Sequence, residues 1–124
     1  MQKTYLGNVI RGDGRGKTIG YPTANIDISN IDITVKPGVY SSKAKLKGNE
    51  EKWYQAILFF GPKKTFDRVE NTLEVHILDF DQDIYDQELE FTIDDFIRGP
   101  VKFNSVEELV RQIKTDISKV RNIK

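Results

Sequence analysis

The chain contains no cysteine, which excludes both a disulfide framework and a thiolate metal site. It has 1 histidine, so a metal site built from several histidines is excluded as well. Neither sign of charge is in excess, because 19 Lys and Arg residues balance 19 Asp and Glu residues. Proteins that bind nucleic acid usually carry a strong basic excess, and its lack argues against that class.

Long apolar runs are also missing. No stretch approaches the roughly 18 apolar residues of a membrane span, and the first residues form no apolar signal segment. With 124 residues the chain is long enough for one ordinary core, and nothing in it repeats. We therefore expect a single domain over residues 1–124 that is a cytoplasmic monomer, with no nucleic-acid or membrane partner.

Alternation of apolar and polar residues is the pattern that the chain does show, and a period of two is typical of half-buried strands. The alternating or apolar segments are 5–10, 40–46, 53–60, 73–77 and 89–93. Gly61-Pro62 is expected to close the third of these segments. Many short strands between about residues 5 and 97, joined by glycine and asparagine turns, predict an antiparallel barrel or sandwich.

Near the C-terminus the period changes to that of a helix. The apolar residues at helical spacing are Val106, Leu109, Val110, Ile113, Ile117 and Val120. Ser105 followed by Glu108 predicts a capping box, in which each side chain accepts a hydrogen bond from the backbone N–H of the other. We expect a helix at about 105–121 whose apolar stripe packs on the β structure.

A glycine-rich segment near the N-terminus is the first candidate site. Gly12, Gly14 and Gly16 make a backbone that can come close to a ligand, and Arg15 and Lys17 add positive charge. The spacing is not that of a Walker A loop, and an extended stretch follows in place of a helix. The segment is either a phosphate cradle or a plain hairpin turn.

Two hard oxygen ligands follow this segment. Thr23 and Asn25 are two residues apart, so in an extended chain they share a face. A hydroxyl and an amide oxygen are ligands that Mg²⁺ accepts beside phosphate oxygens. Together with the glycine-rich segment, they predict a site that handles a nucleotide and a divalent cation.

Glu74 is the most informative single charge, since it lies between apolar Leu73 and Val75 in an expected strand. A glutamate on the exposed face of a strand is the default for this pattern. The alternative is a general base, or a carboxylate that orients a hydroxyl nucleophile. His76 shares the face of Glu74, and for this side chain we favour a structural role over a catalytic one.

Taken together, these segments resemble the riboflavin kinase family. The motifs that carry the resemblance are, in chain order, Gly12-x-Gly14-Arg15-Gly16, Gly20-x-Pro22-Thr23-Ala24-Asn25, Pro37-Gly38-Val39-Tyr40, Leu73-Glu74-Val75-His76-Ile77-Leu78-Asp79-Phe80, Asp83-Ile84-Tyr85 and Phe103-Asn104-Ser105. The resemblance runs from Tyr5 to about Asp116. It implies a mainly β fold: a small closed antiparallel β-barrel of about six strands, with one C-terminal α-helix packed against it.

The resemblance also implies a reaction, the transfer of the γ-phosphoryl group of ATP to the 5′-hydroxyl of riboflavin, which gives FMN and ADP. Glu74 would accept or orient the hydroxyl proton, and Thr23 and Asn25 would hold Mg²⁺ or another divalent cation. Arg98 and Phe103 would contact the flavin. The residues implied in binding the phosphates of ATP are Gly12, Gly14, Arg15, Gly16, Lys17 and Thr23.

Two stretches depart from the family pattern. The family usually has an asparagine or small residue before an Ile-Gly-x-x-Pro-Thr-Phe segment, where this chain has Phe59-Phe60 followed by Gly61-Pro62. Arg98-Gly99-Pro100 lacks a carboxylate that often follows the arginine. Many bacterial members carry an adenylyltransferase domain, for which this chain has no room, so we expect FMN to be its final product. The alternatives are a non-catalytic flavin- or nucleotide-binding barrel and a barrel that binds single-stranded nucleic acid.

Overall fold

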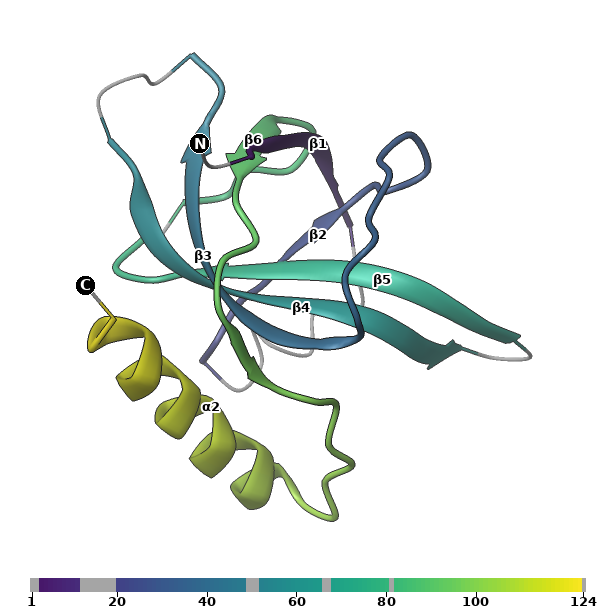
Figure 1. Cartoon of the computed structure of the whole chain (residues 1–124), viewed down its shortest axis with the longest axis vertical. Coiled ribbons are helices and arrows are strands. Elements are labelled where there is room, and N and C mark those ends of the chain that lie inside the picture. Colours follow the sequence, from purple (N-terminus) through teal and green to yellow (C-terminus); the bar gives the residue numbers. More distant parts are fainter. Residues whose placement is uncertain (1–2, 12–19, 49–51, 66–67, 81, 124) are drawn as a thin grey trace.

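The computed structural model describes residues 3–11, 20–48, 52–65, 68–80 and 82–123 (Figure 1). The strands in these ranges are β1 (Tyr5–Ile10), β2 (Ala24–Ile26), β3 (Gly38–Leu46), β4 (Tyr54–Thr65), β5 (Arg68–Ile77), β6 (Glu88–Phe91) and β7 (Phe96–Arg98). Helix α2 covers Val106–Arg121. The helix therefore begins and ends close to the limits expected from the sequence.

The strands close into a barrel. All pairings are antiparallel, in the order β3, β4, β5, β2, β1 and β6, and β6 returns to β3. Strand β7 lies outside this ring of six and pairs with the start of β3. The expected mainly β fold, a closed antiparallel barrel with a C-terminal helix, is thus confirmed.

Alternation along the strands fills the barrel interior. The largest fully buried side chains are Phe91, Leu58, Leu73, Leu89, Val9 and Val75. On β5, Leu73, Val75 and Ile77 are buried, while Glu74 and His76 between them are half-buried on the outer face. The period-two pattern therefore identified the two faces of this strand correctly.

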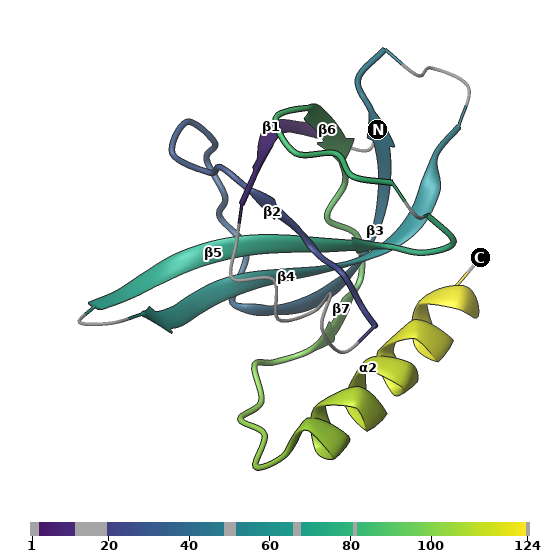
Figure 2. The ribbon, with the colours of Figure 1, turned by 180° about the vertical axis from the view of Figure 1, so that it is seen from behind.

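The predicted end of β4 at Gly61-Pro62 is wrong, because the strand continues to Thr65. Pro62 pairs with Asn71 of β5, while the pairing of β4 with β3 ends at Phe60. Beyond that point β4 is an edge strand, where a residue without an N–H is tolerated. The β4–β5 hairpin consequently extends past the barrel in both ribbon views (Figures 1 and 2).

Helix α2 runs along the outside of the barrel (Figure 2) and contacts β4, where the Gln55 side chain donates to the carbonyl oxygen of Val120 at 3.3 Å. The Ser105 hydroxyl accepts from the N–H of Glu108 at 3.2 Å, as predicted. The Glu108 carboxylate, however, accepts from the N–H of Asn104 at 3.1 Å, one residue before the expected donor. One hydrogen bond of the predicted capping box is therefore formed, and the other is made to Asn104 in place of Ser105.

The predicted apolar stripe of α2 packs only in part. Val106, its first member, is 60% exposed, and the two residues of the helix that are buried are Asp116 and Val120. Leu109, Val110, Ile113 and Ile117 are half-buried and Val120 is buried, so the stripe packs against the rest of the protein as expected, except at its first residue. No helix in the described ranges combines the length and apolarity needed to cross a membrane.

Candidate active site

The strand register brings the predicted polar residues together on the outer face of the barrel. Asn25 of β2 lies directly opposite Glu74 of β5, and Ala24 lies opposite Val75. Since Ala24 and Val75 face the core, their neighbours face outward. Directly opposed residues have Cβ atoms about 4.5–5.5 Å apart, so the side chains of Asn25 and Glu74 start as neighbours on the outer face.

Thr23 makes a direct contact with Glu74. The Thr23 hydroxyl donates a hydrogen bond to Glu74 Oε1 at 3.2 Å, across 51 positions of sequence. The structure thus places a carboxylate, a hydroxyl and an amide within one small patch made of Thr23, Asn25 and Glu74. These are the oxygen donors that a hard divalent cation accepts. Within the described ranges, no group of at least three His, Cys, Asp or Glu residues could hold a metal ion.

His76 touches the segment that leads into Thr23. Its Nδ1 lies 2.7 Å from the carbonyl oxygen of Pro22. Its ring also meets the ring of Tyr21 edge to face, with centroids 5.8 Å apart. The structural role expected for His76 therefore takes a specific form, a contact with two consecutive residues before β2.

The glycine-rich segment predicted to bind phosphate lies outside the described residues; its members are Gly12, Gly14, Arg15, Gly16 and Lys17. The described residues on its two sides do reach the patch. Ile10 of β1 pairs with Asn25, and Gly20 precedes the Tyr21–Thr23 segment with φ of 91°. This is a left-handed conformation that glycine adopts without strain.

A cavity of about 330 Å³ opens beside Thr23 at one end of the barrel. Its lining is mainly apolar and includes Ala24, Ile77, Phe80 and Tyr85. The guanidinium group of Arg11 lies over the ring of Tyr85, with its central carbon 4.5 Å from the ring centroid. This cavity was not predicted from the sequence, although Phe80 and Tyr85 belong to the segments that carry the family resemblance.

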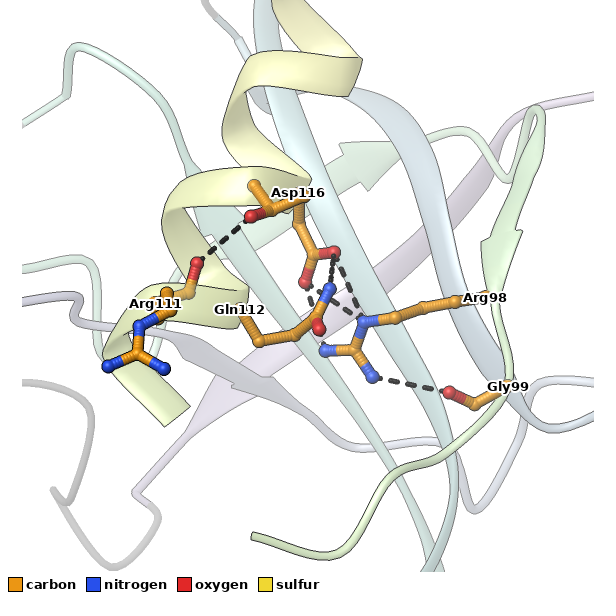
Figure 3. Close-up of polar contacts among 6 residues, drawn as sticks. Arg98, Gly99, Arg111, Gln112 and Asp116 are labelled. Atoms are coloured by element: carbon orange, nitrogen blue, oxygen red, sulfur yellow. Dashed lines mark hydrogen bonds and ion pairs between the residues drawn. The ribbon is translucent and has the colours of Figure 1, made fainter. Parts of the chain in front are cut away.

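Arg98, predicted to contact the flavin, is held by the helix (Figure 3). Its Nη2 donates to Asp116 Oδ2 at 2.9 Å, and its Nε donates to both carboxylate oxygens, at 3.1 and 3.2 Å. The side chains are 18% and 3% exposed, and Gln112 donates a further bond to Asp116 at 2.9 Å. The sequence analysis missed Asp116, because nothing in the pattern of the helix distinguishes a buried carboxylate from an exposed one.

Phe103, the other predicted flavin contact, lies next to Arg98, with 5.8 Å between its ring centroid and the guanidinium carbon. Strand β7 can approach β3 here because Gly38 has no side chain. A Cβ at Gly38 would stand 2.5 Å from the carbonyl oxygen of Arg98. The structure thus brings Arg98 and Phe103 together, with most of the guanidinium already committed to Asp116.

One row of paired residues connects the two parts of the outer face. Glu74 is opposite Phe59, Phe59 is opposite Val39, and Val39 is opposite Arg98. Neighbouring strands lie about 4.8 Å apart, so the path along the sheet from Glu74 to Arg98 is about 14 Å. Phe59, noted as a departure from the family pattern, is the half-buried aromatic residue within this row.

The chain is similar to several known proteins. Over 110 residues it is 44% identical to the trifunctional protein RibF/MnmA of Mycoplasmoides gallisepticum, covering 89% of this chain and 16% of that protein. Over 114 residues it is 41% identical to the bifunctional riboflavin kinase/FMN adenylyltransferase of Listeria monocytogenes, covering 91% of this chain and 35% of that protein. The chain therefore spans 16% and 35% of the lengths of these two curated relatives.

A similar solved structure is described as a macrolide-efflux protein from Streptococcus pneumoniae. It has a TM-score of 0.87 and 37% sequence identity, over 99% of this chain and 40% of that chain. The family model for riboflavin kinase (Flavokinase) matches residues 2–124. On this match over nearly the whole chain, we conclude that it belongs to the riboflavin kinase family.

Proposed function

We propose that this chain is a riboflavin kinase, which transfers the γ-phosphoryl group of ATP to the 5′-hydroxyl of riboflavin and releases FMN and ADP. The contact between Thr23 and Glu74 carries the proposal, since it joins a phosphate- and metal-binding candidate to a candidate base. Membership of the riboflavin kinase family supports the choice of substrates.

On the donor side, the cavity beside Thr23 would receive the base of ATP. Its volume of about 330 Å³ and its apolar lining suit a flat heteroaromatic ring. The phosphates would then extend past Thr23 toward the glycine-rich segment, whose candidate contacts are Gly12, Gly14, Arg15, Gly16 and Lys17. Tyr85 would form one wall for the base, with Arg11 on its ring.

Thr23 and Asn25 would hold Mg²⁺ or another divalent cation. The Thr23 hydroxyl donates to the Glu74 carboxylate, and Asn25 is the cross-strand partner of Glu74, so this set of oxygen donors fits a hard cation. When bound, the cation would neutralise charge on the transferred phosphoryl group.

On the acceptor side, riboflavin would lie along the row from Glu74 to Arg98. The hydroxyl end would lie at Glu74, and the flat ring would extend over Phe59 toward the loop that carries Arg98 and Phe103. A span of about 14 Å suits an acceptor whose reactive hydroxyl and apolar ring are at opposite ends. Arg98 would act mainly by fixing this loop, since Asp116 already holds its guanidinium.

The chemical step then needs one proton acceptor and good alignment. The 5′-oxygen of riboflavin forms a bond to the γ-phosphorus, the bond from that phosphorus to the bridging oxygen breaks, and ADP leaves with the electron pair. The hydroxyl proton passes to the Glu74 carboxylate. Most of the rate enhancement in such a transfer comes from positioning and electrostatics, which the strand register at Thr23, Asn25 and Glu74 would supply.

The test is an incubation with riboflavin, ATP and Mg²⁺, followed by chromatography of the flavins and nucleotides. We expect FMN and ADP in equal amounts, with Glu74→Gln as the matched inactive control. Flavin binding without release of ADP would instead identify a non-catalytic binder.

We also propose that the protein acts as a cytoplasmic monomer without a nucleic-acid partner. The balance of 19 basic and 19 acidic residues supports the lack of a nucleic-acid partner. A gel shift with single-stranded oligonucleotides at low and high salt checks it, and a complex that weakens with salt would favour the nucleic-acid alternative.

A further inference from the structure

We propose that His76 is a positioning residue for the nucleotide side of the reaction, because its ring fixes the backbone segment that presents Thr23 to Glu74. The inference rests on the proposed function and adds a residue to it. It begins from one contact, the 2.7 Å distance between His76 Nδ1 and the carbonyl oxygen of Pro22.

The chemistry of that contact fixes its direction. A carbonyl oxygen can only accept, so Nδ1 of His76 carries the proton and donates it. Pro22 has no N–H of its own, and its carbonyl is therefore the backbone group by which this residue can be held. Tyr21 meets the same ring edge to face at 5.8 Å, so His76 contacts two consecutive residues.

The position of the contact matters because β2 begins only at Ala24. Pro22 and Thr23 precede the strand and follow the glycine-rich segment. Two outward residues of β5 hold them: Glu74 accepts from the hydroxyl of Thr23, and His76 donates to the backbone of Pro22. Without His76, the Pro22–Thr23 segment would keep one of these two contacts, the hydrogen bond from Thr23 to Glu74.

This geometry predicts an effect on one substrate only. Thr23 is a candidate contact of the phosphates and the cation, whereas the proposed riboflavin row runs from Glu74 away from β2. Loosening Pro22 and Thr23 should therefore raise the KM for MgATP and leave the KM for riboflavin unchanged. A neutral hydrogen bond is worth enough to change an affinity by roughly 3–10-fold.

Three substitutions separate the hydrogen bond from the ring. His76→Phe keeps a ring against Tyr21 but removes the donor. His76→Asn has an N–H at the same number of bonds from Cβ as Nδ1, while His76→Gln places it one bond further. We expect the KM for MgATP to rise about 3–10-fold in His76→Phe, with kcat within about threefold of the parent, and to recover in His76→Asn more than in His76→Gln.

Thermal melts confirm that each variant is folded, and calorimetry with MgADP gives a binding readout that needs no turnover.

Equal increases in the KM for both substrates would overturn the inference, as would His76→Asn behaving like His76→Phe. A parent that binds MgADP but makes no FMN would disprove the proposed function alone. In that case weaker MgADP binding by His76→Phe would support the inference, and unchanged binding would overturn it. A parent that makes FMN, with a His76→Phe protein that binds MgADP as the parent does, would overturn the inference alone.

The protonation of the ring gives a second, independent check. Long-range ¹H–¹⁵N NMR of the unliganded protein reports which ring nitrogen carries the proton. We expect the proton on Nδ1 in the neutral ring, and a neutral ring protonated only on Nε2 would contradict the hydrogen bond to Pro22.

Discussion

The outer face of this barrel carries two regions that are built in different ways. The donor region, made of Thr23, Asn25, Glu74 and His76, is formed by β2, β5 and the segment before β2. The acceptor region, made of Arg98, Phe103 and Asp116, depends on a short strand, a loop and a helix. The strand register alone assembles most of the first region, whereas an ion pair holds the second.

This difference separates chemistry from stability. In the donor region the polar side chains are half-buried, and single hydrogen bonds connect them, so a substitution there should change reactivity more than folding. In the acceptor region Asp116 is 3% exposed, so removal of its partner or of its own charge disturbs a buried network.

The largest effect is expected in the donor region, for Glu74→Gln. The substitution keeps the shape of the side chain and removes its negative charge and basic site. We expect kcat to fall by ~10²–10⁴-fold, the usual range for loss of a general base. Binding of flavin and nucleotide should change far less, because the lost interaction matters mainly in the transition state.

Glu90→Gln is the matched control for this prediction. Glu90 is also a half-buried glutamate in a strand, on β6 opposite Leu6, and it lies outside both regions. The Glu90→Gln substitution should therefore leave kcat unchanged. If kcat of the Glu74→Gln protein is within about threefold of the parent value, Glu74 is not the general base.

Asp116→Ala should give the next largest effect, on stability. The substitution leaves the guanidinium of Arg98 largely buried without its partner, and breaking such a pair costs about 3–5 kcal/mol. Urea unfolding measures this loss. The double variant Arg98→Met with Asp116→Leu should be more stable than Asp116→Ala, because apolar side chains of similar size leave no unpaired charge. Equal stability of the single variant and the parent would show that the ion pair does not hold the helix.

Asn25→Ala returns to the donor region and tests the cation. We expect the Mg²⁺ concentration that gives half-maximal rate to rise by roughly 10–100-fold, the range seen when groups that support a metal site are removed. Asn8→Ala is the control, since Asn8 is an exposed strand asparagine on β1. A Mg²⁺ titration of Asn25→Ala that matches the parent would show that the cation is held elsewhere.

The same contrast explains what could be predicted from the sequence. A strand places alternate residues on one face, so the shared face of Thr23 and Asn25, and that of Glu74 and His76, follow from their spacing alone. The N-cap at Ser105 also follows from local sequence, because its hydrogen bond is made within one turn.

The acceptor region could not be predicted in this way, since its contacts join distant residues. The pairing of Arg98 with Asp116 depends on how the helix docks, and an Asp in a charged helix has no local sign of burial. The continuation of β4 through Pro62 depends likewise on the absence of a β3 neighbour at that point. The cavity beside Thr23 needs the barrel to close before Ile77 and Tyr85 can line it.

The smallest effect is expected where the elements of the two regions meet. Arg121, in the last turn of α2, donates two hydrogen bonds of 3.0 Å to Asp79, just after β5. The hydrogen bonds from Arg121, and then its charge, lower the pKa of the Asp79 carboxyl from its ordinary value of 3.8. Because the pKa is lower in the folded protein, the pair stabilises the fold above pH 3.8, and the contribution is lost as the pH falls through the folded pKa.

The Tm difference between the parent and Asp79→Asn should therefore be largest near neutral pH, shrink on acidification and shrink with added salt. The two side chains are 45% and 72% exposed, so the effect should be far below that of Asp116→Ala, and a comparable loss of Tm would refute the contrast between exposed and buried pairs.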